Sequence, residues 1–294
     1  MRWEDFRAST NVEDRRGGGG GLPGGVGGLG IGGVIVLTLV GWAFGIDPRV
    51  LIGGVEQMQG GGRAPTEQAQ PRGQGGQPTD EMGRFAAAIL GNTEDVWKAV
   101  FPQQVNRQYQ PPKLVLFSRA TRSGCGAASS QMGPFYCPRD QTVYVDLTFF
   151  QEMQQKFRAG GDFAYAYVIA HEVGHHIENQ LDILGKVQAR QQEVSEREAN
   201  QLSVRVELMA DCLAGVWAFH SNQRWKSLEE GDIQEAMNAA AAIGDDRLQK
   251  QAQGYAIPDS FTHGSSEQRM RWFMTGMKGG QVQQCDTFRA GTRL

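Results

Sequence analysis

One helix-length run, residues 163–181, constrains this chain most, because its apolar sequence carries the motif His171-Glu172-Val173-Gly174-His175. In a helix, His171 and His175 are four residues apart and project from one face, one turn above the other. That spacing allows two imidazoles to bind one metal ion. Glu172 lies about 100° further round the helix, where its carboxylate reaches a metal-bound water. The pattern is the H-E-x-x-H signature of zinc hydrolases.

The same short pattern also fits a solvated polar helix face, so its surroundings matter. The chain has five histidines, and three of them (His171, His175 and His176) fall within six residues. Residues 164–170 are apolar and predict a buried helix, on which each unpaired imidazole or carboxylate would cost about 1–3 kcal/mol. A metal site is therefore favoured. His176 is rotated about 100° from His175, and we interpret it as a structural or surface histidine.

A third protein ligand is expected, because a catalytic zinc usually keeps three protein ligands and one open position. Metzincins would have His at 181 and Gly at 178, where this chain has Leu181 and Glu178, so the metzincin class is excluded. The long helix predicted over about 195–219 carries Glu207 and Asp211 in an E-x-x-A-D pattern. We expect Glu207 to bind the metal and Asp211 to hydrogen-bond a ligand histidine. The alternative, a buried salt bridge, would require cationic partners.

Residues 81–294 predict an α+β domain that is mostly helical, with a small antiparallel sheet. Apolar periodicity begins at 82–89 and 96–101, and further helices are expected at about 148–157, 162–180, 195–219, 232–243 and 267–277. Two β-branched and aromatic runs, 113–118 and 142–147, predict strands.

The first third of the chain has a different composition, since most of the excess among its forty glycines lies before residue 80. Residues 27–46 are uncharged and supply the roughly 20 residues that cross a bilayer, so we predict a transmembrane anchor there. A cleaved signal peptide and a buried core helix are the alternatives. The expected organisation is a cytoplasmic polar and glycine-rich head at 1–26, the anchor at 27–46, a flexible, disordered Gly/Gln/Pro linker at 47–80 and a metallopeptidase domain at 81–294.

The charged residues on either side of the anchor predict its orientation in the membrane. Arg2, Arg7, Arg15 and Arg16 precede it, and only Arg49 follows closely. The positive-inside rule then predicts a cytoplasmic N-terminus and a catalytic domain on the extracytoplasmic side of the plasma membrane. The net charge of -3 leaves no basic surface, so a nucleic-acid partner is not expected.

The four cysteines form no C-x-x-C pair, which argues against a cysteine zinc cluster. Cys125 and Cys137 bracket a Gly/Ser/Pro-rich loop between the two predicted strands, which a disulfide would staple. Cys212 and Cys285 would then tie the long helix to the C-terminal tail. The alternative is four free thiols. An even count and an extracytoplasmic location favour the two disulfides.

H-E-x-x-H followed by E-x-x-A-D is the gluzincin pattern, and the chain resembles the bacterial YpfJ-like neutral zinc metallopeptidase family over essentially its full length. The resemblance also includes residues 1–6, the glycine-rich lead to a single apolar span, residues 136–140 and residues 210–217. It implies a zincin-like domain at a bacterial inner membrane, with its catalytic domain periplasmic and with a peptide or protein as substrate. Other protein partners are not indicated.

The resemblance also implies a site. One Zn²⁺ per chain would lie on His171, His175 and Glu207, with Glu172 as the base. The His/His/Glu set favours zinc on ligand type. Residues 262–269 are similar to the T-H-P-x-x-x-x-R segment of membrane-associated gluzincins, although Gly264 stands where they have Pro.

His263 in that segment is therefore a candidate catalytic residue that stabilises an oxyanion or orients its neighbours; the alternative is a helix-capping loop. By analogy with zincins, strand 142–147 is expected to be the edge strand that pairs with a substrate peptide.

In the expected mechanism, zinc lowers the pKa of its water from 15.7 to about 7, and Glu172 takes the proton and returns it to the leaving amine. Two alternatives stay open: a non-catalytic envelope protein with a structural metal, and a metal hydrolase acting on a non-peptide amide. A structural zinc has no need of Glu172 and tends to close with four protein ligands.

Overall fold

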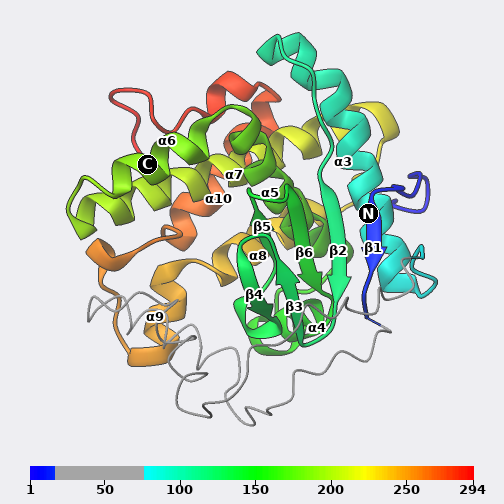
Figure 1. Cartoon of the computed structure of the whole chain (residues 1–294), viewed down its shortest axis with the longest axis horizontal. Coiled ribbons are helices and arrows are strands. Elements are labelled where there is room, and N and C mark those ends of the chain that lie inside the picture. Colours follow the sequence, from blue (N-terminus) through cyan, green and yellow to red (C-terminus); the bar gives the residue numbers. More distant parts are fainter. Residues whose placement is uncertain (17–75) are drawn as a thin grey trace, which may run out of the picture.

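The structure, a computed structural model, describes residues 1–16 and 76–294 and is mostly helical (Figure 1). Its helices are α3 (Glu81–Val105), α4 (Thr148–Phe157), α5 (Asp162–Gln180), α6 (Ile183–Gln191), α7 (Glu196–Trp225), α8 (Asp232–Ala242), α9 (Asp245–Gln253) and α10 (Ser266–Gly279), with short 3-10 turns η1 (Ser130–Met132), η2 (Pro258–Ser260) and η3 (Val282–Cys285). Its strands are β1 (Val12–Asp14), β2 (Lys113–Phe117), β3 (Ala120–Ser123), β4 (Gly126–Ser129), β5 (Phe135–Cys137) and β6 (Thr142–Asp146).

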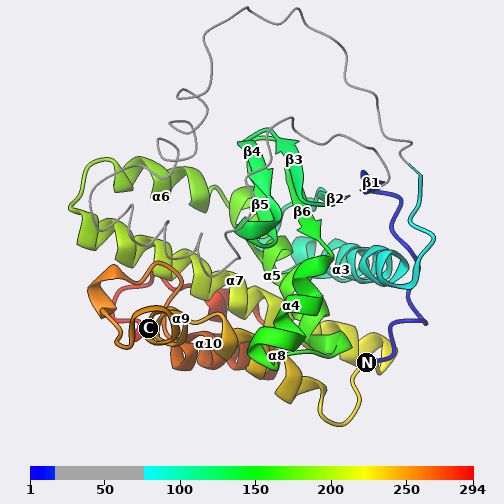
Figure 2. The ribbon, with the colours of Figure 1, turned by 90° about the horizontal axis from the view of Figure 1, so that it is seen from below.

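Helix α5 lies in the middle of the molecule, between the main sheet and a layer formed by α7, α8 and α10 (Figure 2). The prediction for residues 162–180 is confirmed, because α5 spans Asp162–Gln180. Every residue from Phe163 to Gly174 is buried. A helix that is apolar nearly all round needs packing on all sides, which explains its central place.

Helix α7 brings the second half of the motif to α5. A capping box of Ser195 and Glu198 begins α7, which then runs through Trp225, six residues beyond the predicted end at about 219. Gly174 permits the close approach of the two helices, since a Cβ there would lie 2.9 Å from the Ala210 carbonyl oxygen. The residue next to Ala210 is Asp211, so this contact sets the acidic side of α7 against the histidines.

The main sheet has the order β1-β2-β6-β5, in which β1, β2 and β6 are parallel and only β5 is antiparallel to its neighbour. The predicted antiparallel sheet is therefore wrong for the main sheet as a whole. Among the described strands, antiparallel pairing occurs between β5 and β6 and in the separate β3–β4 hairpin. The hairpin and β5 intervene between β2 and β6, and the chain returns beside β2 in the same direction. Strand β6 lies between β2 and β5, so residues 142–147 do not form the expected edge; β5 does.

Residues 1–16 belong to the folded domain (Figure 1). Strand β1 pairs with β2, with Val12 opposite Leu114, and Met1 and Phe6 are buried in the core that also contains α3 and α5. We predicted a head at 1–26 that is separate from a domain starting at 81. Residues 1–16 instead pack into that domain. The predicted boundary came from local composition, which carries no information about contacts between distant residues such as Val12 and Leu114.

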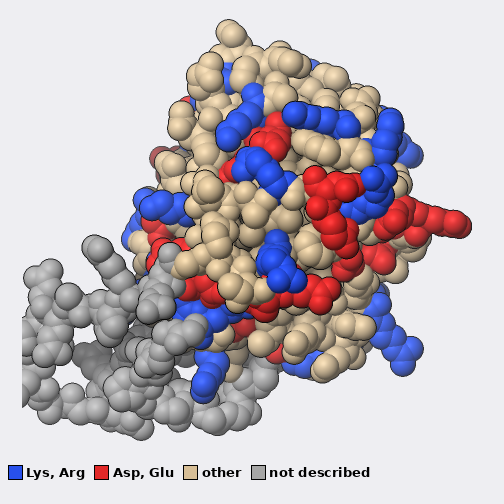
Figure 3. All heavy atoms as spheres, turned by 90° about the vertical axis from the view of Figure 1, so that its right-hand side faces the viewer, with Lys and Arg blue, Asp and Glu red and all other residues tan. Residues whose placement is uncertain are grey.

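The four arginines that suggested a cytoplasmic flank form ion pairs in the fold. They are Arg2 with Asp5, Arg7 with Glu94 and Asp95, Arg15 with Glu13, and Arg16 with Asp14 and Asp80. On the face of the molecule where β1 and α3 lie, basic and acidic side chains adjoin one another (Figure 3). The positive-inside count considers only residues near the apolar run, whereas Arg7 and Asp95 are 88 residues apart.

The predicted fold class also included a transmembrane helix ahead of the domain, and this part has no support. Within residues 1–16 and 76–294, no helix is both long and apolar enough to cross a membrane. The range 27–46 lies outside the described residues, as does most of the predicted linker at 47–80. We therefore correct the fold class to a mostly helical α+β domain with a mixed sheet and a separate hairpin.

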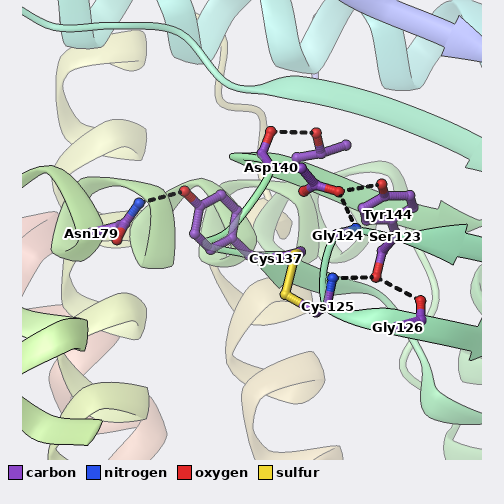
Figure 4. The surroundings of a disulfide bond; sticks show 10 residues. Ser123, Gly124, Cys125, Gly126, Cys137, Asp140, Tyr144 and Asn179 are labelled. Carbon is purple, nitrogen blue, oxygen red and sulfur yellow. Dashed lines mark hydrogen bonds between the residues drawn. A yellow bond between two sulfur atoms is a disulfide. The ribbon is translucent and has the colours of Figure 1, made fainter. Parts of the chain in front are cut away.

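Both favoured cysteine pairs are disulfide-bonded. Cys125 and Cys137 join the β3–β4 hairpin to β5, with Cα atoms 5.8 Å apart (Figure 4). The side chain of Asp140, close by, accepts a hydrogen bond from the Tyr144 hydroxyl. Cys212 and Cys285 join α7 to η3, with Cα atoms 5.4 Å apart.

Candidate metal centre

Three side chains from two helices converge at the contact of α5 and α7. The Nε2 atom of His171 lies 3.2 Å from Oε2 of Glu207, and Nε2 of His175 lies 3.5 Å from Oε1 of the same carboxylate. One potential ligand atom from each residue lies within 4.8 Å of the other two. The side chains of His175 and Glu207 are 13% and 18% exposed, so the cluster opens to solvent on one side.

The other ring nitrogen of each histidine contacts a carboxylate. Nδ1 of His171 lies 2.8 Å from Oδ1 of Asp211, and Nδ1 of His175 lies 2.8 Å from Oε2 of Glu178. A carboxylate accepts the Nδ1–H proton in each case, so the nitrogen left to bind a metal is Nε2, which faces Glu207. Metal-binding histidines in proteins are oriented in the same way.

The donor set fits a divalent cation of the zinc type. Two imidazole lone pairs and one carboxylate are the ligands of many catalytic zinc sites. Although burial opposes the charged imidazolium, Glu178 and Glu207 raise the pKa of His175 to about 10. Burial also opposes ionisation of Glu207, but His175 and His263 hold its pKa well below the usual value. The raised pKa of His175 and the lowered pKa of Glu207 both indicate that the cluster favours a positive charge at its centre.

Glu172 lies on α5 beside the two histidines and is 7% exposed. Burial raises the pKa of its carboxyl, and the charges of His175 and His171 partly offset that effect. A general base works best when its pKa lies near the working pH, so the direction of this shift suits proton transfer.

Asp211 has both of the roles considered from sequence. It accepts from Nδ1 of His171, and it also forms a buried salt bridge with Arg269 of α10, whose Nε lies 2.8 Å from Oδ2. The hydroxyl of Tyr167 donates to Oδ1 at 2.5 Å. Sequence reasoning assigned no role to Arg269 or Tyr167, because neither contact is visible without the tertiary structure.

Glu178 was also missed as a functional residue. Its side chain is fully buried, and one of its oxygens, Oε1, has no hydrogen-bond partner among the described residues. The sequence did contain a signal for this contact, because Glu178 lies three residues after His175, on the same face of one helix.

His263 lies in the loop between η2 and α10, with a half-exposed side chain. Asp245 holds this loop by accepting the backbone N–H groups of Thr262, His263 and Gly264 at 2.7, 2.6 and 3.1 Å. Nδ1 of His263 lies 3.2 Å from Oδ1 of Asp245. Burial opposes the imidazolium, but Asp245 and then Glu207 raise the pKa of His263 to about 9.

Gly264 has a φ of 89°, which explains the departure from the T-H-P pattern. Proline is locked near a φ of about −65° and cannot adopt this conformation.

His176 faces the sheet instead of the metal cluster. Its Nδ1 lies 2.9 Å from the Tyr136 hydroxyl of β5, and its Nε2 lies 2.6 Å from the Gln110 carbonyl oxygen. Burial lowers its pKa to about 4, so the ring is neutral. These contacts agree with the structural interpretation made from sequence.

Comparison with known proteins identifies relatives over the full chain. The family described as "Putative neutral zinc metallopeptidase" matches residues 1–288. The uncharacterized protein YpfJ of Escherichia coli K12 is 49% identical over 299 residues, covering 98% of this chain and 99% of its own. The uncharacterized proteins Mb2605 of Mycobacterium bovis and Rv2575 of Mycobacterium tuberculosis are each 45% identical over 211 residues, covering 68% of this chain and 69% of their own. No solved structure matches significantly. The chain therefore belongs to the family described as "Putative neutral zinc metallopeptidase".

Proposed function

We propose that this protein is a zinc-dependent peptidase that hydrolyses peptide bonds, with one Zn²⁺ per chain bound by His171, His175 and Glu207. The observation that carries the proposal is the convergence of both Nε2 atoms on one carboxylate, while each Nδ1 atom contacts a second carboxylate. Three protein ligands and partial exposure suit a catalytic site, because structural zinc sites usually close with four protein ligands.

Zinc, when bound, supplies Lewis acidity and lowers the pKa of a coordinated water towards neutrality. Glu172 takes a proton from the attacking water as the new C–O bond forms. It returns that proton to the amine nitrogen as the C–N bond breaks, so that one water is consumed and two termini are released. Asp245 lies 3.2 Å from Nδ1 of His263 and raises the pKa of that imidazole, which favours its cationic form; the cation would stabilise negative charge on the peptide oxygen.

The test is cleavage of an unfolded protein by the purified full chain, with and without chelator, beside Glu172→Gln. The full chain is required because residues 1–16 are part of the fold. We expect chelation to abolish cleavage, and Glu172→Gln to retain one zinc while losing about 10²–10⁴-fold in turnover. Turnover that survives in zinc-loaded Glu172→Gln contradicts the assignment of the base. A folded, zinc-loaded wild-type chain that cleaves no peptide bond contradicts the peptidase.

We also propose that the described domain works outside the cytoplasm. The support is its two disulfides, which persist in oxidising compartments and are rare in the cytosol. Because β1 pairs with β2, we place residues 1–16 in the same compartment as the rest of the domain. This proposal replaces the expected cytoplasmic N-terminus.

Cysteine labelling at two exposed positions, Thr10 ahead of β1 and Lys98 on α3, tests on which side of the membrane each segment lies. We expect Thr10→Cys and Lys98→Cys to react equally with a membrane-impermeant maleimide in spheroplasts. Reaction of Lys98→Cys alone would place residues 1–16 on the other side of the membrane and contradict the proposal.

A further inference from the structure

Arg269 is a cation buried beside the candidate metal centre. It comes from α10, and its side chain is 2% exposed. Its Nε donates to Oδ2 of Asp211 at 2.8 Å, and its Nη2 donates to Oδ1 at 2.9 Å. The guanidinium therefore binds both oxygens of one carboxylate, which fixes the plane of the carboxylate as well as its position.

The carboxylate that Arg269 holds is the one that orients His171. Oδ1 of Asp211 lies 2.8 Å from Nδ1 of His171 and also accepts the Tyr167 hydroxyl. Nη2 of Arg269 lies 3.3 Å from that hydroxyl oxygen, so Arg269, Tyr167 and Asp211 form a closed network. Without the bidentate contact, Oδ2 of Asp211 loses its partner and only Oδ1 stays held by Tyr167, so the plane of the carboxylate and its contact with Nδ1 of His171 are less restrained.

We propose that Arg269 is a positioning residue of the metal centre, which acts through Asp211 to keep Nε2 of His171 directed at Glu207. Nη2 of Arg269 also lies 3.5 Å from Nδ1 of His171. Both groups are N–H donors here, so Arg269 acts on this ligand through Asp211, and its contribution depends on the two-point geometry of the guanidinium. Lysine preserves the charge but offers a single point contact, so it does not replace arginine here. The inference rests on the proposed metal site and is independent of whether the site cleaves peptides.

The test compares Arg269→Lys with Arg271→Lys in the full chain. Arg271 lies on the same helix and pairs with Glu267 near the surface, with a 37% exposed side chain, so the same chemical change is made away from Asp211. Zinc affinity is measured by competition with a chromogenic chelator. We expect Arg269→Lys to weaken zinc binding about 10- to 100-fold, as is typical when a partner of a metal ligand is lost. Arg271→Lys should bind zinc as the wild type does.

Two further measurements separate positioning from general loss of stability. In the zinc-loaded protein, ¹H–¹⁵N NMR should show a slowly exchanging Nδ1–H of His171 in the wild type and a faster-exchanging one in Arg269→Lys. Trp272→Phe changes a buried residue of α10 that makes no hydrogen bond to Asp211. It should lower the melting temperature without altering the exchange of the His171 Nδ1–H or the zinc affinity.

A double-mutant cycle tests the route of the effect. On an Asp211→Asn background, Arg269→Lys should change zinc affinity much less than it does in the wild type, because the effect is transmitted through Asp211. Additive losses would overturn the proposal, as would wild-type zinc affinity in Arg269→Lys or an equal loss in Trp272→Phe. Failure to cleave peptides alongside the predicted zinc and NMR changes would refute the peptidase and leave this inference standing.

Discussion

His175 and His176 are neighbours in the sequence, yet they face two regions with opposite electrostatic character. His175 faces α7, where it lies 3.5 Å from Glu207, and it also lies 2.8 Å from Glu178 of its own helix. His176 faces the sheet and contacts a tyrosine hydroxyl and a backbone carbonyl. The pKa of His175 is raised to about 10, and that of His176 is lowered to about 4. Burial opposes charge on both rings, so the nearby carboxylates make the difference.

The comparison teaches that residue type alone does not make a metal ligand. An imidazole surrounded by carboxylates favours a bound cation, whether a proton or a metal. An imidazole with only neutral partners stays neutral and serves as a hydrogen-bonding link, here between α5 and β5.

The largest expected effect comes from substituting His175 and His176 one at a time. His175→Ala should lose the bound zinc and all turnover, because the centre then keeps only two protein ligands. His176→Phe should retain one zinc per chain, since His176 does not face Glu207. Zinc content by atomic absorption, measured on folded protein, checks both variants. Zinc loss in His176→Phe would remove the distinction between the two faces of α5.

A second effect appears in the acid stability of the metal-free protein. The folded pKa of His176 is about 4 against an ordinary 6.5, so the unfolded chain binds this proton first as the pH falls. Stability is therefore lost as the pH falls from 6.5 towards 4, by about 2 kcal/mol between pH 6.5 and 5. Urea unfolding of the wild type and His176→Phe at both pH values measures the difference. An equal pH dependence in the two proteins would contradict a neutral His176.

His175 should have the opposite sign in the same experiment. Its folded pKa of about 10 lies above the ordinary 6.5, so its contribution is fully present below pH 6.5 and is lost as the pH rises towards 10. The two histidines thus act in separate pH windows, and His175→Ala should flatten only the alkaline one.

The smallest expected effect concerns the partner of His175. Glu178→Gln keeps an acceptor for the Nδ1–H group but removes the charge, and it should weaken zinc binding about 10-fold. Glu193→Gln is the matched control, because the Glu193 side chain is 68% exposed and pairs with Arg190, away from the histidines. Chelator competition compares the two variants. Equal affinities would mean that the Glu178 charge has no part in the difference between the two faces of α5.

The features that sequence predicted correctly depend on short separations or on strong burial signals. The pair His171 and His175 needs only one helical turn, and the bounds of α5 follow from its apolar run. Glu207 and Asp211 were singled out because two carboxylates on an apolar helix require partners, and both contact His171. Metal binding by Glu207 stays a prediction. The cysteine pairs follow from their positions around a loop and between a helix and the tail.

The features that sequence missed depend on contacts between distant segments. The parallel pairing of β1 with β2 joins residues about a hundred positions apart, as in Val12 with Leu114. Arginines near an apolar run suggested a membrane flank because ion pairs such as that of Arg7 with Glu94 and Asp95 on α3 could not be known. The inner position of β6 likewise required the full strand order.

The sequence by itself determined which chemical groups lie one helical turn apart on α5, because backbone geometry alone sets that spacing. Only the tertiary structure decided which way each ring nitrogen is directed, because Asp211 and Arg269 come from α7 and α10 and meet His171 through packing. Local periodicity determines a helix face, whereas the direction of a side chain on that face depends on the partners that other segments bring to it.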